Sequence, residues 1–342
     1  MNIDIEIVGI TVLWTFLFGY LIIGSIDYGA GFFNAYNLLT DKEHVLTKII
    51  QRYLSPVWEV TNVFLVFFFV GIIGFFPKTA FYYGTVLLVP VSIALLLLAI
   101  RGSYYAFETY GARGHKGYSF MYGLSGLLLP ASLSIVLTIS EGGFVHLDRG
   151  KPVLNYFILF ISPLTWSIFL LSITAVLYIS AVFLTWYAHK AKDTLATNVM
   201  RKYALIWSLP SIITASSIIY QLKFHNDEHF NRLMHLWWMF ALSLLFFVGT
   251  VLLLWAKRNY GFAFISLIAQ YALAFYGYGI SHYPYLLYPF LTLYDSFTNE
   301  AMAISLIIAF ILGLGLLIPS LYLLLRLFLF NKGYVKGNSD YY

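Results

Sequence analysis

Apolar segments long enough to cross a membrane follow one another along nearly the whole chain. A hydrocarbon core about 30 Å thick takes about 20 residues of α-helix, because each residue advances the helix by about 1.5 Å. Only 10% of the 342 residues are charged and 61% are hydrophobic, whereas soluble domains carry about 25% charged residues. Too few polar side chains remain to cover a soluble protein of this size. The sequence therefore predicts an all-α integral membrane protein.

Nine segments have this character and predict nine transmembrane helices. They cover residues 8–36, 57–76, 80–104, 118–139, 156–187, 203–222, 233–255, 260–281 and 300–330. An odd number of spans places the two termini on opposite sides. The loops of one side, together with the C-terminal tail, hold thirteen Lys and Arg residues, against five on the other side. Since the positive side faces the cytoplasm, we expect the N-terminus outside and the C-terminus in the cytoplasm.

Four ionisable side chains stand out within or next to the predicted spans: Asp27, Glu59, Arg101 and Glu108. Each such group costs at least about 2.5 kcal/mol at the centre of a membrane helix, so it is a functional candidate by default. All four belong to the region of the first three spans, with Glu108 just past the inner end of the third. Two interpretations stay open. The acids can form a proton relay, or Arg101 can neutralise Asp27 or Glu59 in an ion pair that serves packing alone.

Asp27 shares one helical face with Gly24, Gly31 and Asn34. Counted from Gly24, the other three follow after three, seven and ten residues. Small residues on a membrane helix let another helix approach closely. We therefore expect the Asp27 side chain to point toward neighbouring helices rather than toward lipid. It lies about ten residues, or about 15 Å, from the cytoplasmic end of its span.

The other acids lie nearer the predicted cytoplasmic side. Glu59 and Asn62 lie close together in the second span, and Arg101 and Glu108 lie two turns apart on the third. From the cytoplasm inward, the expected order of the acids is Glu108, Glu59 and Asp27. A staggered row of acidic groups with water between them is typical of proton relays.

Ligands for metals and cofactors are scarce. The chain has no cysteine, which excludes disulfides, thiolate metal sites and iron–sulfur clusters. Nearly all of the eight histidines fall in loops or at span ends, and the segment "HNDEH" (225–229) is expected to be a solvated loop rather than a metal site. His235 with Met239 is the one marginal haem candidate. The basic residues lie in short loops, so no nucleic-acid partner is expected.

Three motifs occur in order between residues 20 and 110. They are "SIDYGAGFF" in the first span, "LSPVWEVTNVFL" opening the second and "IRGSYYAFETYG" at the inner end of the third. In sequence, spacing and position they resemble subunit II of the cytochrome bd-type quinol oxidases. The motif residues are Asp27, Gly29, Gly31, Trp58, Glu59, Asn62, Arg101 and Glu108.

The resemblance implies a fold of two pseudo-symmetric four-helix bundles and a peripheral ninth helix. The first bundle, 1–140, carries the buried acids, the second covers 141–298, and 299–342 holds the ninth helix and the cytoplasmic tail. The expected location is the bacterial cytoplasmic membrane, crossed many times by the chain.

The resemblance also implies a function. Such oxidases oxidise a membrane quinol, reduce dioxygen to water and build up membrane potential. Haems b and d and the quinol site belong to the larger subunit I, so this chain is expected to be a companion without cofactor, metal or catalytic residue, and inactive alone. Its proton pathway is expected at Asp27, Glu59 and Glu108, with Arg101 as charge partner and Gly29, Gly31, Trp58 and Asn62 as motif support.

The sequence departs from the family's pattern in two places, and alternative functions stay open. Ser25 and Ile26 stand where many relatives carry a further Asp, and Phe64 stands where a Trp is common. A proton-coupled secondary transporter that uses Asp27 as its coupling site is the main alternative, and a purely structural assembly subunit is the third. The quinol species, a small single-span subunit and bound lipid or quinone stay open.

Overall fold

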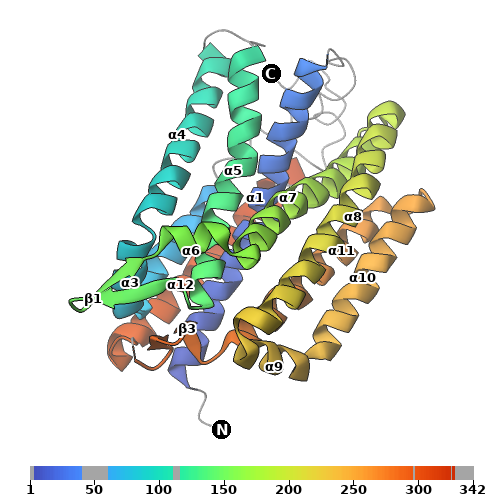
Figure 1. Cartoon of the computed structure of the whole chain (residues 1–342). Helices are drawn as coiled ribbons and strands as arrows, with labels where there is room; N and C mark the ends of the chain where they lie inside the picture. Colours follow the sequence, from blue (N-terminus) through green and yellow to red (C-terminus); the bar gives the residue numbers. More distant parts are fainter. Residues whose placement is uncertain (1–3, 41–60, 111–115, 296, 325, 328–342) are drawn as a thin grey trace.

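The structure, a computed structural model, describes residues 4–40, 61–110, 116–295, 297–324 and 326–327, with no side-chain description for 105–110. This part of the chain is mostly helical (Figure 1), which confirms the predicted class. Its helices are α1 (Ile5–Leu39), α3 (Pro77–Val86), α4 (Leu88–Tyr110), α5 (Lys116–Ser140), α6 (Tyr156–Ile161), α7 (Pro163–Lys190), α8 (Thr194–His225), α9 (Asp227–His235), α10 (Trp237–Trp255), α11 (Tyr260–His282) and α12 (Glu300–Leu324). One further helix covers Thr61–Phe75.

Two short antiparallel hairpins, which the sequence did not predict, lie in the connections between helices. Strand β1 (Val145–Asp148) pairs with β2 (Lys151–Leu154), and β3 (Tyr285–Leu287) pairs with β4 (Leu291–Thr292). Strands this short give no readable alternation of apolar and polar residues, which is why the pattern of the sequence missed them.

Seven helices of the described chain are long and apolar enough to cross a membrane: α1, α5, α7, α8, α10, α11 and α12. The count rises to eight if Thr61–Phe75 and α3 form one span, although the two are bent by 119° at their junction. The nine-span count therefore stays a prediction.

The breaks between helices follow from local chemistry. Pro77 and Pro163 stand at the first position of α3 and α7, where the missing N–H of proline costs nothing. Side-chain caps begin other helices: Asp193 accepts from the Ala196 N–H at 2.9 Å, and Asn226 accepts from the His229 N–H at 3.1 Å. Three segments expected to be continuous are divided: 80–104 into α3 and α4, 156–187 into α6 and α7, and 233–255 into α9 and α10.

Helices α1 and α7 lie between α4 and α5 on one side and α8, α10 and α11 on the other (Figure 1). α5 runs antiparallel to α1, since Gly126 faces Tyr28 and Gly123 faces Ala35. The end of α5 therefore lies beside the beginning of α1. Side chains on the outside are apolar and exposed, as expected for surfaces that face lipid: Leu245, Trp255 and Leu316 are 64%, 73% and 74% exposed.

Two glycines of the first motif let α1 lie close to both neighbours. A Cβ on Gly29 would come 2.4 Å from the Ser180 Cβ of α7, and a Cβ on Gly31 would come 2.6 Å from the Tyr122 ring of α5. The Ser180 hydroxyl uses this proximity to donate to the Ile26 carbonyl oxygen at 3.0 Å. Close packing in a membrane depends on such small residues.

We predict that Gly29→Ala lowers the stability of the protein, because overpacking of a tight contact costs about 1–3 kcal/mol. The matched control is Gly84→Ala on α3, where a Cβ would meet nothing within 4 Å. The measurement is the thermal unfolding midpoint of the purified protein in mild detergent. Equal effects of the two substitutions would contradict the close contact of α1 with α7.

Candidate functional site

An ion pair joins α1 to α4 in the interior of the protein. The Arg101 Nη2 atom lies 2.8 Å from the Asp27 Oδ2 atom, and both side chains are only 1% exposed. The helical face of Asp27 thus points inward. Because each buried ion loses several kcal/mol of hydration, the surroundings of the pair have to supply further polar contacts.

Tyrosines and a glycine hold the Arg101 guanidinium. Nη1 donates to the Tyr122 carbonyl oxygen at 3.2 Å and Nη2 donates to the Tyr122 hydroxyl at 3.0 Å. The guanidinium carbon lies 4.2 Å from the centre of the Tyr122 ring and 4.7 Å from that of Tyr28, distances at which cation–π attraction is effective. A Cβ on Gly126 would come 2.7 Å from Nη1, so only glycine leaves room for the arginine.

Buried polar groups continue from Asp27 toward the end of α1. Asn34 is fully buried, and neither its amide nitrogen nor its amide oxygen has a hydrogen-bond partner in the described part of the chain. The amide nitrogen of Asn37 and the Ser119 hydroxyl of α5 are buried in the same way. Native proteins seldom leave such groups unsatisfied, and ordered water is their usual partner.

The remaining residues of the expected proton pathway cannot be placed. Glu59 and Trp58 lie outside the described residues, and Glu108 belongs to α4 in a stretch whose side chains are not described. Asn62 lies in the helix Thr61–Phe75 and is half-buried. The structure therefore brings together Asp27 and Arg101, and the row of three acids stays a prediction.

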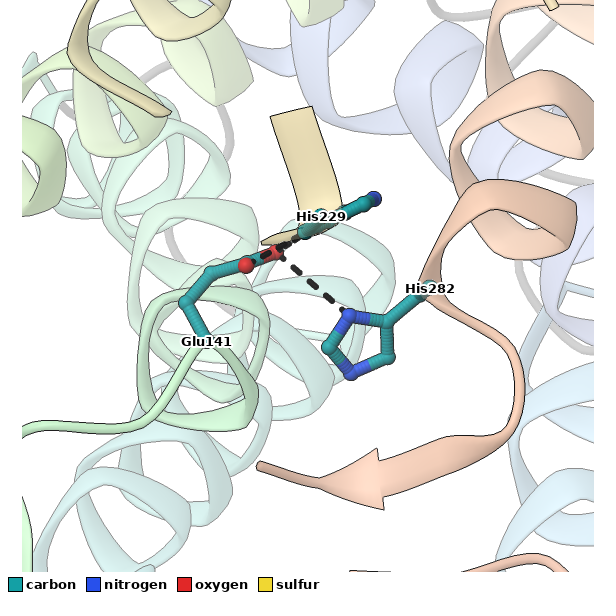
Figure 2. A group of neighbouring side chains, drawn as sticks. All are labelled: Glu141, His229 and His282. Carbon is teal, nitrogen blue, oxygen red and sulfur yellow. Dashed lines mark hydrogen bonds and ion pairs between the residues drawn. The ribbon is translucent and has the colours of Figure 1, made fainter. Parts of the chain in front are cut away.

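A second buried cluster was missed by the sequence analysis. Glu141, His229 and His282 come from the end of α5, from α9 and from the end of α11, and Figure 2 shows them turned toward one another. The His229 Nδ1 atom lies 2.9 Å from Glu141 Oε2, and His282 Nδ1 lies 3.7 Å from Glu141 Oε1. His229 is fully buried.

The expected solvated loop at 225–229 is therefore wrong. Asn226 caps α9 through its side-chain oxygen, and its amide nitrogen donates to Glu141 Oε2 at 3.2 Å. An asparagine before two acidic residues is a helix-start signal, and it could have revealed α9. The contact with Glu141, a residue 85 positions away from Asn226, leaves no signal in a single sequence.

Glu141 is held as a carboxylate. The Tyr278 hydroxyl donates to Oε1, while His229 and Asn226 reach Oε2. Burial acts to raise the pKa of Glu141, but the contacts with His229, His282 and Tyr278 hold this pKa below its ordinary value. A carboxylate with three such contacts is a fixed negative charge at this end of the protein.

Comparisons with known proteins cover nearly the whole chain. The family described as cytochrome bd terminal oxidase subunit II matches residues 5–328. A Bacillus subtilis protein, provisionally named cytochrome bd menaquinol oxidase subunit II, is 33% identical over 339 residues, which are 96% of this chain and 97% of that protein. A chain of the bd oxidase structure from Geobacillus thermodenitrificans is 64% identical, with a TM-score of 0.85 over 96% of this chain and 100% of that one.

We predict that Arg101→Met lowers the free energy of unfolding by about 3–5 kcal/mol, because it leaves the Asp27 charge buried without its partner. The double variant Asp27→Leu/Arg101→Met recovers most of this loss, since both charges are then gone. Unfolding by titration with a denaturing detergent measures both effects.

Glu228→Gln is the control for this pair. It breaks the ion pair with Arg232, in which the Glu228 side chain is 50% exposed, and exposed pairs contribute at most about 1 kcal/mol. A double variant no more stable than Arg101→Met would show that the charges do not depend on each other.

Proposed function

Because the chain belongs to the family of cytochrome bd terminal oxidase subunit II, we propose that it is the haem-free companion of a haem-bearing subunit I and brings protons from the cytoplasm to the oxygen-reduction site. The chain is a multi-span membrane subunit of a quinol oxidase, an oxidoreductase of the respiratory chain. Haems b and d and the quinol site are assigned to subunit I. A small single-span subunit is compatible with this assignment.

The proton route is carried by one observation, the buried amides beyond Asp27. Asn34 offers two N–H groups and an oxygen with two lone pairs, and all of them lack a partner in the described residues. It lies seven residues, or about 10 Å, from Asp27 toward the end of α1. Water bound to such amides links Asp27 to that end of the helix, where the sequence predicts Glu59 and Glu108.

The ion pair with Arg101 suits the inner end of such a route. Arginine stays protonated at all relevant pH values, so Asp27 keeps a neutralising partner in the apolar interior. Water at the Asn34 amides then meets an acceptor whose position is fixed by α4 and α5. The charge is thus balanced locally, and within the described part of the chain the Asn34 amide keeps its hydrogen-bonding groups for water.

The absence of haem from this chain is supported by the position of the marginal ligand pair. His235 is the last residue of α9 and is exposed, whereas Met239 is buried in α10 beyond the break at Leu236. The two residues therefore lie on different helices and cannot share the face that their spacing suggested.

The proposed architecture has two four-helix groups, 1–140 and 141–298, with 299–342 as the peripheral ninth helix and tail. Contacts of α5 with α1 and α4 support the first group, and contacts of α7 with α8 and of α10 with α11 support the second. The proposed orientation in the bacterial cytoplasmic membrane has the N-terminus outside and the C-terminus inside, following the distribution of Lys and Arg.

We predict that Asn34→Leu in the purified oxidase complex slows oxygen consumption per haem by about tenfold, which corresponds to about 1.4 kcal/mol in the barrier. Stability stays unchanged or rises, because the substitution breaks no hydrogen bond between described residues. The measurements are oxygen uptake, proton uptake by the complex in vesicles, and thermal unfolding.

The matched control is Gln270→Leu on α11, which removes another buried amide whose oxygen has no partner in the described chain. It leaves turnover unchanged because it lies outside the proposed route. Unchanged turnover in Asn34→Leu would remove this amide from the route and favour the purely structural subunit. A chain that purifies alone and without haem would instead favour the alternative of a proton-coupled transporter.

A further inference from the structure

His282 is a buried histidine whose ring nitrogens need polar partners. The residue is 9% exposed, and neither ring nitrogen has a hydrogen-bond partner in the described part of the chain. Its Nδ1 atom nevertheless faces Glu141 Oε1 at 3.7 Å. A buried ring with two unsatisfied nitrogens calls for a bound water or ion, and the neighbouring groups indicate which of the two fits.

The protonation of His229 follows from Ser281. The Ser281 hydroxyl donates its only hydrogen to the Tyr278 carbonyl oxygen at 2.9 Å. It therefore accepts a hydrogen bond from His229 Nε2 at 2.7 Å. In a neutral ring the other nitrogen, Nδ1, then carries a lone pair that faces the Glu141 carboxylate at 2.9 Å. Two such atoms need a positive centre between them, either a proton or a metal cation.

The third side chain favours the metal cation. A proton shared by His229 and Glu141 leaves both nitrogens of His282 without a partner. A metal cation can bind all three side chains, since one ligand atom from each lies within 4.8 Å of the others. Zn²⁺ binds imidazole nitrogen and carboxylate oxygen at about 2.0–2.2 Å, which places neighbouring ligand atoms about 3.3 Å apart, between the observed 2.9 and 3.7 Å.

The supporting contacts match those of metal-binding sites. A ligating histidine usually donates its second N–H to a fixed acceptor, as His229 does to Ser281. The Tyr278 hydroxyl and the Asn226 amide orient the carboxylate. The nearby cation, Arg232, is already paired with Glu228 at 2.5 Å and donates to the Ser281 carbonyl oxygen.

The backbone after Glu141 fixes the site further. Gly142 has a φ of +83°, and a Cβ there would lie 2.5 Å from the Tyr288 carbonyl oxygen. Its own carbonyl oxygen lies 3.0 Å from His225 Nε2 at the end of α8. Glu141 is thus held in place before any ion arrives.

We propose that Glu141, His229 and His282 bind one divalent transition-metal cation, with Zn²⁺ as the probe, and that this ion fastens the ends of α5, α9 and α11 together. The site lies at the end of the protein where α1 begins, and it serves a purpose separate from the proposed proton route. Two imidazoles and one carboxylate leave a further ligand position for water.

The test uses the purified native oxidase complex, freed of metal with a chelator and then dialysed against buffered free Zn²⁺. Wild type is expected to hold one more Zn²⁺ per complex than His282→Ala, whose affinity falls by about 100-fold or more. Ser281→Ala weakens binding by about 10–100-fold, the usual effect of removing a supporting contact. The control His146→Ala, an exposed residue of β1, leaves binding unchanged.

Zinc-edge X-ray absorption of the loaded wild-type complex gives an answer that needs no variant. Scattering from two imidazole rings at about 2.0 Å is expected, together with a rise in the thermal unfolding midpoint on adding Zn²⁺. Zinc uptake that is equal in wild type, His282→Ala and Ser281→Ala would overturn the proposal. A spectrum without imidazole scattering, or no uptake at all, would overturn it even if His282→Ala failed to assemble.

Discussion

The packing of helices α1, α4 and α5 depends on the buried ion pair between Asp27 and Arg101. Removing two charges from water costs several kcal/mol for each ion, and their attraction offsets this cost only when further polar contacts are present. The Tyr122 carbonyl and hydroxyl supply these contacts, and Gly126 leaves the room. Helices α1, α4 and α5 therefore have to meet at one level of the membrane, which fixes their relative positions along their axes.

The same pair explains why the polar groups beyond it can serve another purpose. Asp27 and Arg101 pair with each other, whereas Asn34 is equally buried but has no partner among the described residues. A buried amide left without a hydrogen bond costs about 1–3 kcal/mol, so a chain that kept it for packing alone would be less stable than one with leucine there. In the proposed route, water at this position offsets the cost and connects Asp27 with the end of the helix.

Sequence reasoning succeeded where one helix carries the information. The 3.6-residue period of α1 predicted that Asp27 faces its neighbours, and the charge of Arg101 made it a candidate partner because both lie in apolar spans. The period could not predict the Glu141 cluster. Glu141 follows its predicted span, and its partners lie 88 and 141 residues further along the chain. The breaks at Leu87 and Leu236, both inside predicted spans, were missed for a related reason, since hydropathy records the apolar length of a segment and not its direction.

Helix α5 separates the two buried clusters and makes them independent. Tyr122, near its beginning, touches Arg101, and Glu141 directly follows its end. The two residues are nineteen positions apart, which corresponds to about 28 Å along the axis, nearly the thickness of the hydrocarbon core. The proposed proton route near the end of α1 is therefore too far from Glu141 to be joined to it by a short chain of water. A cation at Glu141 acts on the second half through the geometry of α5, α9 and α11, and electrostatic coupling with Asp27 is weak over this distance.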